Sequence, residues 1–149
     1  MERVTFSIKI SDIASIVESV TYEASKSAPD VRTASGISFD DSDDVQHGTL
    51  LASLGSAMAA LCSSLKRLKA DGSVKVPSGS VELSFNEDTG TTVSGMLTTA
   101  LRSYLVDSFI SDHFGAKGLP TASFYAQNAG NYLASIVSMA FERKPNTIG

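Results

Sequence analysis

The residues best able to do chemistry form an acidic cluster with a histidine close behind it. The cluster consists of Asp40, Asp41, Asp43 and Asp44. A calcium-binding loop places oxygen ligands at alternate positions around a central glycine and ends in a distal glutamate. Here Val45 takes the next alternate position, His47 follows it, and no glutamate stands at the required distance. We therefore expect an acidic, solvated entry to a helix and no metal site.

Nucleophilic chemistry has little support in the sequence. Ser63 and Lys66 match the Ser-x-x-Lys spacing of penicillin-binding enzymes, but the companion motifs are missing and the chain is too short for such a fold. Phosphate-binding glycine-rich loops and paired-cysteine sites are also missing. His47 and His113 lie far apart, and the single Cys62 falls in an apolar stretch typical of a buried, inert thiol. We expect no enzymatic activity and no cofactor.

Composition favours a single domain that contacts other proteins. A chain of 149 residues is long enough for one hydrophobic core. Charged residues make up 19% of it, below the usual share of about a quarter, which suggests that part of the surface faces protein. The net charge of −4 argues against general nucleic-acid binding, and the stretch 121–141 lacks the basic residues of a DNA-recognition helix.

Signals for export or membrane insertion are weak. The N-terminus lacks the basic start and apolar run of a signal peptide. The uncharged segment 49–65 is interrupted by serines and is shorter than the roughly 20 residues that span a bilayer. We therefore expect a soluble, cytoplasmic protein with no membrane partner.

The elements that must position these residues are mostly helical. Alternating apolar residues over 4–10 predict a short strand. Ser11 and Asp12 are suitable N-caps for a first helix, which should end before Pro29. A long acidic loop is expected over 27–44.

A second helix, around 51–68, has the clearest pattern. Its apolar residues recur at spacings of three and four, which predicts one buried seam. The seam consists of Leu51, Leu54, Met58, Leu61, Leu65 and Leu68. Basic residues fall in the last turns, as the helix dipole favours, and Gly72 is expected as the first residue beyond the helix.

The rest of the chain predicts a hairpin and two more helices. Alternation over 74–76 and 81–85 predicts the hairpin. A third helix should begin near Val93 and end at Gly115, and a fourth should open at Pro120 and Thr121. The residues expected to point inward on the fourth helix are Tyr125, Ala129, Tyr132, Ile136 and Ala140.

Together these elements predict a mostly α (α+β) domain over 1–149. It should be a four-helix bundle with a short N-terminal strand, a small β-hairpin between the second and third helices, and a C-terminal tail over 145–149. No internal repeat is visible.

Two helix faces carry small residues where charges would be usual. They consist of Ala52, Ser56, Ala59 and Ser63 on the second helix and of Ala126, Gly130 and Ala134 on the fourth. A glycine within a helix costs about 1 kcal/mol relative to alanine, so close approach of another backbone is a reason to keep it. Either these faces pack inside the monomer or they form a self-association surface.

The end of the fourth helix also has two interpretations. Arg143 and Lys144 are the only basic residues beyond Thr121, and Pro145 follows them directly. In one interpretation, the two positive charges stabilise the helix by interacting with the negative, C-terminal end of its dipole. Alternatively, the tail orders on a partner as an extended segment.

The order of elements resembles that of a known family. The stretch 101–107 (LRSYLVD), the ending 141–145 (FERKP) of an Ala/Tyr-rich helix, and the strand-to-helix start over 8–13 are similar to the small head–tail connector, or neck ring, proteins of tailed bacteriophages. The similarity covers most of the chain and concerns layout and local patterns.

This resemblance implies a virion structural protein that catalyses nothing. Such proteins form rings, commonly of about twelve subunits, beneath the portal protein and offer a surface to the next neck or tail protein. DNA would pass through as cargo, and an acidic channel would not grip it. Terminal segments commonly reach the portal, which would give Arg143, Lys144 and Pro145 a docking role. The alternatives are another small virion assembly protein (auxiliary capsid, cargo or tail-completion), a small enzyme, or a bacterial helical adaptor.

Overall fold

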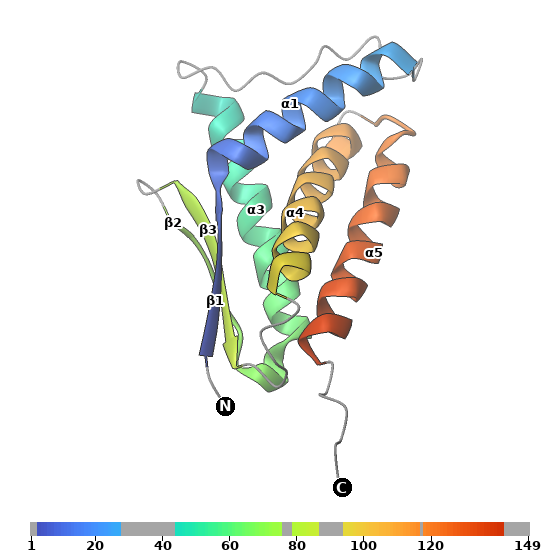
Figure 1. Ribbon diagram of the computed structural model, residues 1–149. Helices are drawn as coiled ribbons and strands as arrows, with labels where there is room; N and C mark the ends of the chain where they lie inside the picture. The colour runs from blue at the N-terminus through green and yellow to red at the C-terminus, as the bar shows by residue number, and fades with distance from the viewer. Residues whose placement is uncertain (1–2, 28–43, 76–78, 87–93, 117, 142–149) are drawn as a thin grey trace, which may run out of the picture.

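Four helices and three strands make up the described part of the chain. The computed structural model describes residues 3–27, 44–75, 79–86, 94–116 and 118–141. The elements in chain order are β1 (Arg3–Lys9), α1 (Ile10–Ser27), α3 (Asp44–Ser64), the 3-10 turn η1 (Lys66–Leu68), β2 (Asp71–Lys75), β3 (Ser80–Asn86), α4 (Ser94–Ala116) and α5 (Ala122–Ala140). The predicted mostly helical α+β class with an N-terminal strand is confirmed (Figure 1).

The three strands form one antiparallel sheet in the order β1-β3-β2. The predicted hairpin is confirmed as β2 and β3, and β1 adds to the free edge of β3 with Phe6 opposite Leu83. Inward-facing Val81, Leu83 and Phe85 are buried, whereas the opposite face is polar, with a 2.9 Å hydrogen bond between the hydroxyls of Thr5 and Ser84. The sheet therefore has one core face and one solvent face, as alternation requires.

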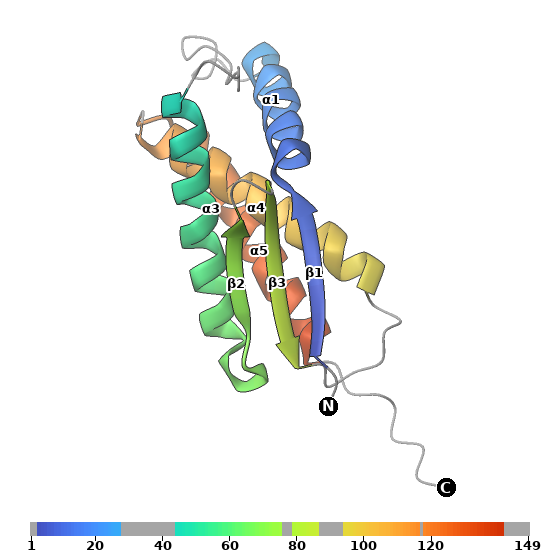
Figure 2. The same cartoon turned by 90° about the vertical axis from the view of Figure 1, so that its left-hand side faces the viewer.

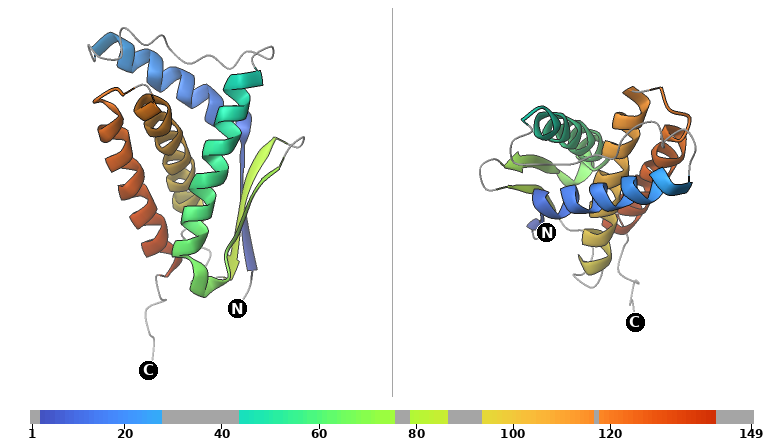
Figure 3. Two further views of the ribbon diagram at one scale, coloured as in Figure 1. Left: turned by 180° about the vertical axis from the view of Figure 1, so that it is seen from behind. Right: turned by 90° about the horizontal axis from the view of Figure 1, so that it is seen from above.

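The helices cover the core face of the sheet in two layers. α3 lies beside β2, α4 crosses behind the sheet, and α5 lies on the far side of α4 (Figures 1 and 2). α1 lies across the upper ends of the other helices, so the four do not run together as the predicted bundle would (Figures 1 and 3). The turn from β1 into α1 is immediate, which sets this crossing direction. α4 contacts α1, α3 and α5 and is the centre of the core.

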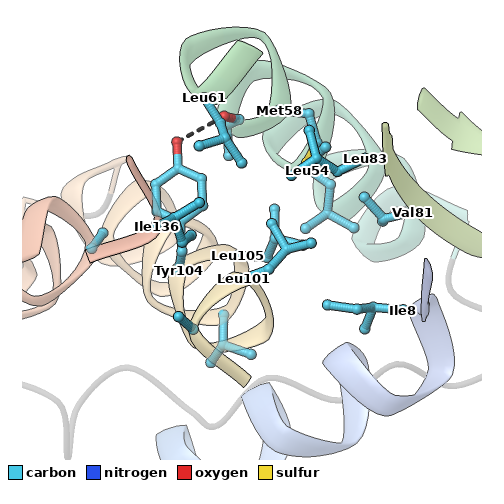
Figure 4. Packing of buried hydrophobic residues seen from close by; sticks show 14 of the residues in the cluster. Ile8, Leu54, Met58, Leu61, Val81, Leu83, Leu101, Tyr104, Leu105 and Ile136 are labelled. Carbon is cyan, nitrogen blue, oxygen red and sulfur yellow. Dashed lines mark hydrogen bonds between the residues drawn. The ribbon is translucent and has the colours of Figure 1, made fainter. Parts of the chain in front are cut away.

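The apolar seam of α3 is shifted by one residue at its start. Leu54, Met58, Leu61, Leu65 and Leu68 are buried as predicted. At the first position the prediction is wrong, because Leu50 is fully buried and Leu51 is only half-buried. Two adjacent leucines fit the spacing equally well, and the position of α4 decides between them. Figure 4 shows Leu61 beside Tyr104 of α4.

Three predicted helix ends differ from the structure. α1 begins at Ile10, so Ser11 and Asp12 lie in its first turn and do not cap it. α3 ends at Ser64, and Lys69, not Gly72, takes the left-handed conformation after η1, with φ 54°. α4 continues through Gly115 to Ala116, and the left-handed residue beyond it is Gly118, with φ 70°. In each case the predicted residue has the local preference of a helix terminus, but the helix begins or ends a few positions away from it.

Gly72 lies in β2, where a side chain would meet α3. A Cβ atom at this position would stand 2.8 Å from Cε of Met58 and 3.0 Å from Sγ of Cys62. The glycine therefore permits β2 to approach α3, a role that differs from the helix end predicted for it.

Candidate functional site

The small residues predicted to form self-association faces are all exposed. They are Ala52, Ser56, Ala59 and Ser63 on α3 and Ala126, Gly130 and Ala134 on α5. A Cβ atom added to Gly130 would meet nothing within 4 Å. Packing against the described residues therefore does not account for these faces. The structure leaves both faces open for contact with another molecule.

The two faces border a groove on one side of the molecule. α3 and α5 form its walls through Ser56 and Ala126, and α4 forms its floor with Ser108, Ser111 and Asp112. Its volume is about 250 Å³. Figure 3 shows α3 and α5 on either side of α4 in the view from behind. Tertiary packing thus brings together two rows of small residues that lie about seventy positions apart in the sequence.

Two hydrogen bonds hold α4 against α3 beneath this groove. The buried Tyr104 hydroxyl donates to the Ala57 carbonyl oxygen at 2.7 Å, and the Ser53 hydroxyl donates to Oδ2 of Asp112 at 2.6 Å. Burial raises the pKa of Tyr104, so its hydroxyl stays protonated and remains a donor. The second bond has a charged acceptor, which makes it stronger than a neutral pair. These two bonds hold α3, one wall of the groove, at a set distance from α4, its floor.

A larger groove separates the first turns of α4 from the last turns of α5. Its volume is about 780 Å³. The lining residues are Gly95, Met96, Thr99, Ala100, Tyr132, Ala134, Ser135, Ser138 and Met139. The Tyr132 phenol is the only ionisable group among them. Tyr132 was predicted to point inward, but it is 37% exposed at this groove. The helical spacing placed Tyr132 at the border of the apolar face, and α4 is not close enough there to cover it.

Cys62 is half-buried beside β2 and shows no feature of a reactive thiol. It lines a hollow of about 300 Å³ together with Met58 and Gly72. Burial raises the pKa of the thiol, and the charge of Asp71 raises it further. A raised pKa keeps the sulfur protonated and weakly nucleophilic. The predicted inert thiol therefore agrees with its surroundings, although the residue is less buried than expected.

The remaining predicted residues lie apart from these grooves or outside the described structure. Ser63 and Lys66 are both exposed near the end of α3. The ring of His113 lies 5.9 Å from the rings of Phe109 and Phe114. The acidic positions 40, 41 and 43 and the docking residues Arg143, Lys144 and Pro145 lie outside the described residues. Within the described ranges, no three His, Cys, Asp or Glu side chains are placed to hold a metal ion.

Comparison with known proteins yields no match. No family model, curated protein or solved structure matches the chain. The resemblance to connector proteins therefore rests on the sequence features alone. In the part of the chain that the structure describes, no helix is long and apolar enough to cross a membrane.

Asp107 is a half-buried acid on α4 near Tyr125 of α5. Burial raises the pKa of its carboxyl from the ordinary 3.8 to about 6. Burial also raises the pKa of Tyr125, and the Asp107 charge adds to this effect. The folded protein therefore binds a proton at Asp107 more readily than the unfolded chain does, so ionised Asp107 destabilises the fold at neutral pH.

We expect Asp107→Asn to stabilise the protein at pH 7.5 by about 1 kcal/mol, because a two-unit pKa shift is worth roughly 3 kcal/mol before solvent screening of a half-exposed group. At pH 4 the difference should nearly vanish, since stability from the raised pKa is present at low pH and is lost as pH rises through about 6. Urea titrations at both pH values measure this. Asp112→Asn is the matched control and should destabilise, because Asp112 accepts the Ser53 hydrogen bond. If Asp107→Asn stabilised the protein equally at both pH values, the raised pKa of Asp107 would not be the cause of the stabilisation.

Proposed function

We propose that this protein is a structural subunit of a phage particle, of the head–tail connector type, which assembles into a ring. The observation that carries the proposal is the pair of exposed small-residue faces on α3 and α5. Helix faces without charges or long side chains permit close backbone approach, and both faces are exposed in the part of the chain that the structure describes. The order of the elements is similar to that of neck ring proteins, and this similarity favours a connector over the other virion assembly roles.

The two faces suit a head-to-tail contact between copies. The face of α3 and the face of α5 lie on the two sides of one groove. A contact of the α3 face with the α5 face of the next copy is heterologous when the reciprocal contact is not made by the same pair of copies. Repetition of such a contact produces a ring where the rotation closes. Portal and neck proteins would bind the ring, with Arg143, Lys144 and Pro145 as docking residues by the family resemblance. DNA would pass through the ring without sequence readout, and the net charge of −4 is compatible with this.

We expect Gly130→Leu to abolish ring assembly and to leave a folded monomer. A leucine at this position would extend from the α5 face into the space that a neighbouring copy needs, whereas the monomer offers it open space. Mass photometry measures assembly and circular dichroism measures folding. Gly130→Ala is the matched control: it should add up to about 1 kcal/mol of helix stability and largely retain assembly.

The outcomes distinguish the proposal from its rivals. Rings of wild-type protein that bind a co-expressed portal protein support a connector. Assemblies that form but never bind portal favour another virion assembly role. Unchanged assembly by Gly130→Leu would show that the α5 face is not used.

A further inference from the structure

The outer surface of α5 forms one continuous, uncharged face. Phe124, Asn131, Ser135 and Ser138 recur at spacings of seven, four and three, which places them on one side of the helix. All four are exposed, whereas the opposite side of α5 packs against α4. No residue of Ala122–Ala140 is charged. Among the described residues, neither charge nor packing against another element therefore accounts for this face.

Large apolar side chains are concentrated at the same face and at the groove beside it. Among the described residues, four large hydrophobic side chains are exposed: Met96 (68%), Phe124 (59%), Tyr22 (59%) and Tyr132 (37%). Three of these belong to α5 or to the start of α4. Met96 and Tyr132 line the groove of about 780 Å³ near the C-terminal end of α5, and Phe124 protrudes near its N-terminal end. One end of the helix thus presents an aromatic side chain and the other a groove able to accept one.

The chemistry of the groove limits what can occupy it. Its lining contains methionine, tyrosine and hydroxyl groups and no ionisable residue except the tyrosine phenol. A charged occupant would lose water without gaining a partner of opposite charge. An aromatic side chain would contact the methionines favourably. An uncharged segment with an exposed aromatic residue suits this groove, and α5 itself, with Phe124, is such a segment.

We propose that a second copy of this chain covers this face, with the two α5 helices antiparallel and crossing at Asn131. Phe124 lies seven residues before Asn131 and Ser138 lies seven residues after it. A two-fold axis at Asn131 therefore brings Phe124 of each copy to the level of Ser138 in the other, about 10 Å from the crossing point. There Phe124 enters the groove between Met96 and Tyr132 of the other copy. Asn131 meets its own equivalent, and a side-chain amide can both donate to and accept from an identical amide.

Charge supports self-pairing at this face. Two copies that each carry a net charge of −4 repel, so they approach at least cost where neither surface is charged. α5 provides such a surface along its whole length of 19 residues, or about 28 Å. A contact of that length and one helix in width covers less than the roughly 800 Å² per partner of a standard interface. We therefore expect a weak dimer that forms in a concentration-dependent way.

This inference does not depend on the proposed function. The ring contact uses Ala126, Gly130 and Ala134 on the flank of α5 and the small-residue face of α3, whereas the dimer contact uses the outer face of α5. The two share only Ala134, which also lines the larger groove. Either contact can therefore exist without the other, and different variants test them.

Cysteine cross-linking tests the two-fold axis directly. In a Cys62→Ala background, Asn131→Cys should form a covalent dimer under mild oxidation, because residue 131 meets itself across the axis. Ser15→Cys, exposed on α1, is the matched control and should not cross-link. Sedimentation velocity of the wild-type chain should show a concentration-dependent dimer, and Phe124→Asp should shift it to monomer with an unchanged circular dichroism spectrum. Tyr22→Asp changes an aromatic residue of equal exposure on α1 and should leave the dimer intact.

Two results would overturn the inference. One is a wild-type chain that stays monomeric at high micromolar concentration. The other is self-association in which Asn131→Cys does not cross-link or Phe124→Asp has no effect. If rings form but neither the Asn131→Cys cross-link nor a dimer sensitive to Phe124→Asp is found, the dimer contact is wrong and the ring proposal stands. If Phe124→Asp abolishes a dimer and no ring is seen under any condition, the dimer contact is supported and the ring proposal fails.

Discussion

Leu61→Ala should lower the free energy of unfolding by about 2–5 kcal/mol, the range for removal of a fully buried leucine side chain. Leu61 has no exposed surface and lies between α3 and α4, beside Tyr104 (Figure 4). Substitution by alanine loses the transfer free energy of the missing carbons and leaves a cavity, because hydrogen bonds from Tyr104 and Ser53 hold α4 at its present distance from α3. A urea titration monitored by circular dichroism measures the change.

The first turns of α3 supply a matched pair of controls for this experiment. Leu50→Ala should cost a similar amount, because Leu50 is fully buried. Leu51→Ala should cost much less, since Leu51 is half-buried. The two residues are identical in type and adjacent in the chain, so the difference reports which of them faces the core. A larger loss of stability for Leu51→Ala than for Leu50→Ala would contradict the placement of Leu50, rather than Leu51, in the core.

Gly72→Val should destabilise the protein by about 2–3 kcal/mol, although valine is normally favoured in strands over glycine. The new Cβ atom would stand 2.8 Å from Cε of Met58, 3.0 Å from Sγ of Cys62 and 3.3 Å from Cβ of Met58. The end of the Met58 side chain can move, but its Cβ and the Cys62 side chain are attached directly to α3. The Cys62 side chain and the backbone on either side must therefore give by a few tenths of an ångström, which strains the packing between β2 and α3. Thermal unfolding and urea titration both measure the effect.

A second glycine provides the control of opposite sign. A Cβ atom at Gly55, in the middle of α3, would meet nothing within 4 Å. Gly55→Ala should therefore stabilise the protein by up to about 1 kcal/mol through helix propensity alone. Adding Cys62→Ala to Gly72→Val should restore part of the lost stability, since it removes one of the crowded atoms. Equal effects of substitution at the two glycines would show that contact with α3 is not the reason for Gly72.

Local patterns determined the class of each element. Alternation in 4–10, 74–76 and 81–85 predicted all three strands, and spacings of three and four predicted the seams of the helices. These patterns depend on nearest-neighbour geometry, which a chain carries in its sequence. They could not decide between neighbouring residues of similar propensity. Leu50 in place of Leu51 and Gly118 in place of Gly115 are choices of this kind. Lys69 is different, because it takes the left-handed conformation that local propensity assigns to a glycine.

The candidate surfaces were predicted in part. The small residues of α3 and α5 could be identified from composition and spacing alone, because an uncharged helix face is unusual wherever it lies. Whether they were internal or exposed depended on where α4 packs, and only the structure shows that they are open. The larger groove at Met96 and Tyr132 had no signal in the sequence, because its two walls lie more than thirty residues apart and Tyr132 has the spacing of a core residue.

By itself, the sequence determined the strands, the helices, the apolar seams and the low charge of the second and last helices, since each is a property of adjacent residues. The tertiary structure decided the rest. It placed β1 beside β3, turned α1 across the other helices, and left α5 packed on α4 with an uncharged face outward. The physical reason is that burial is a property of pairs of elements: the same helix face is core or surface according to what packs against it, and no spacing within one helix records its neighbour.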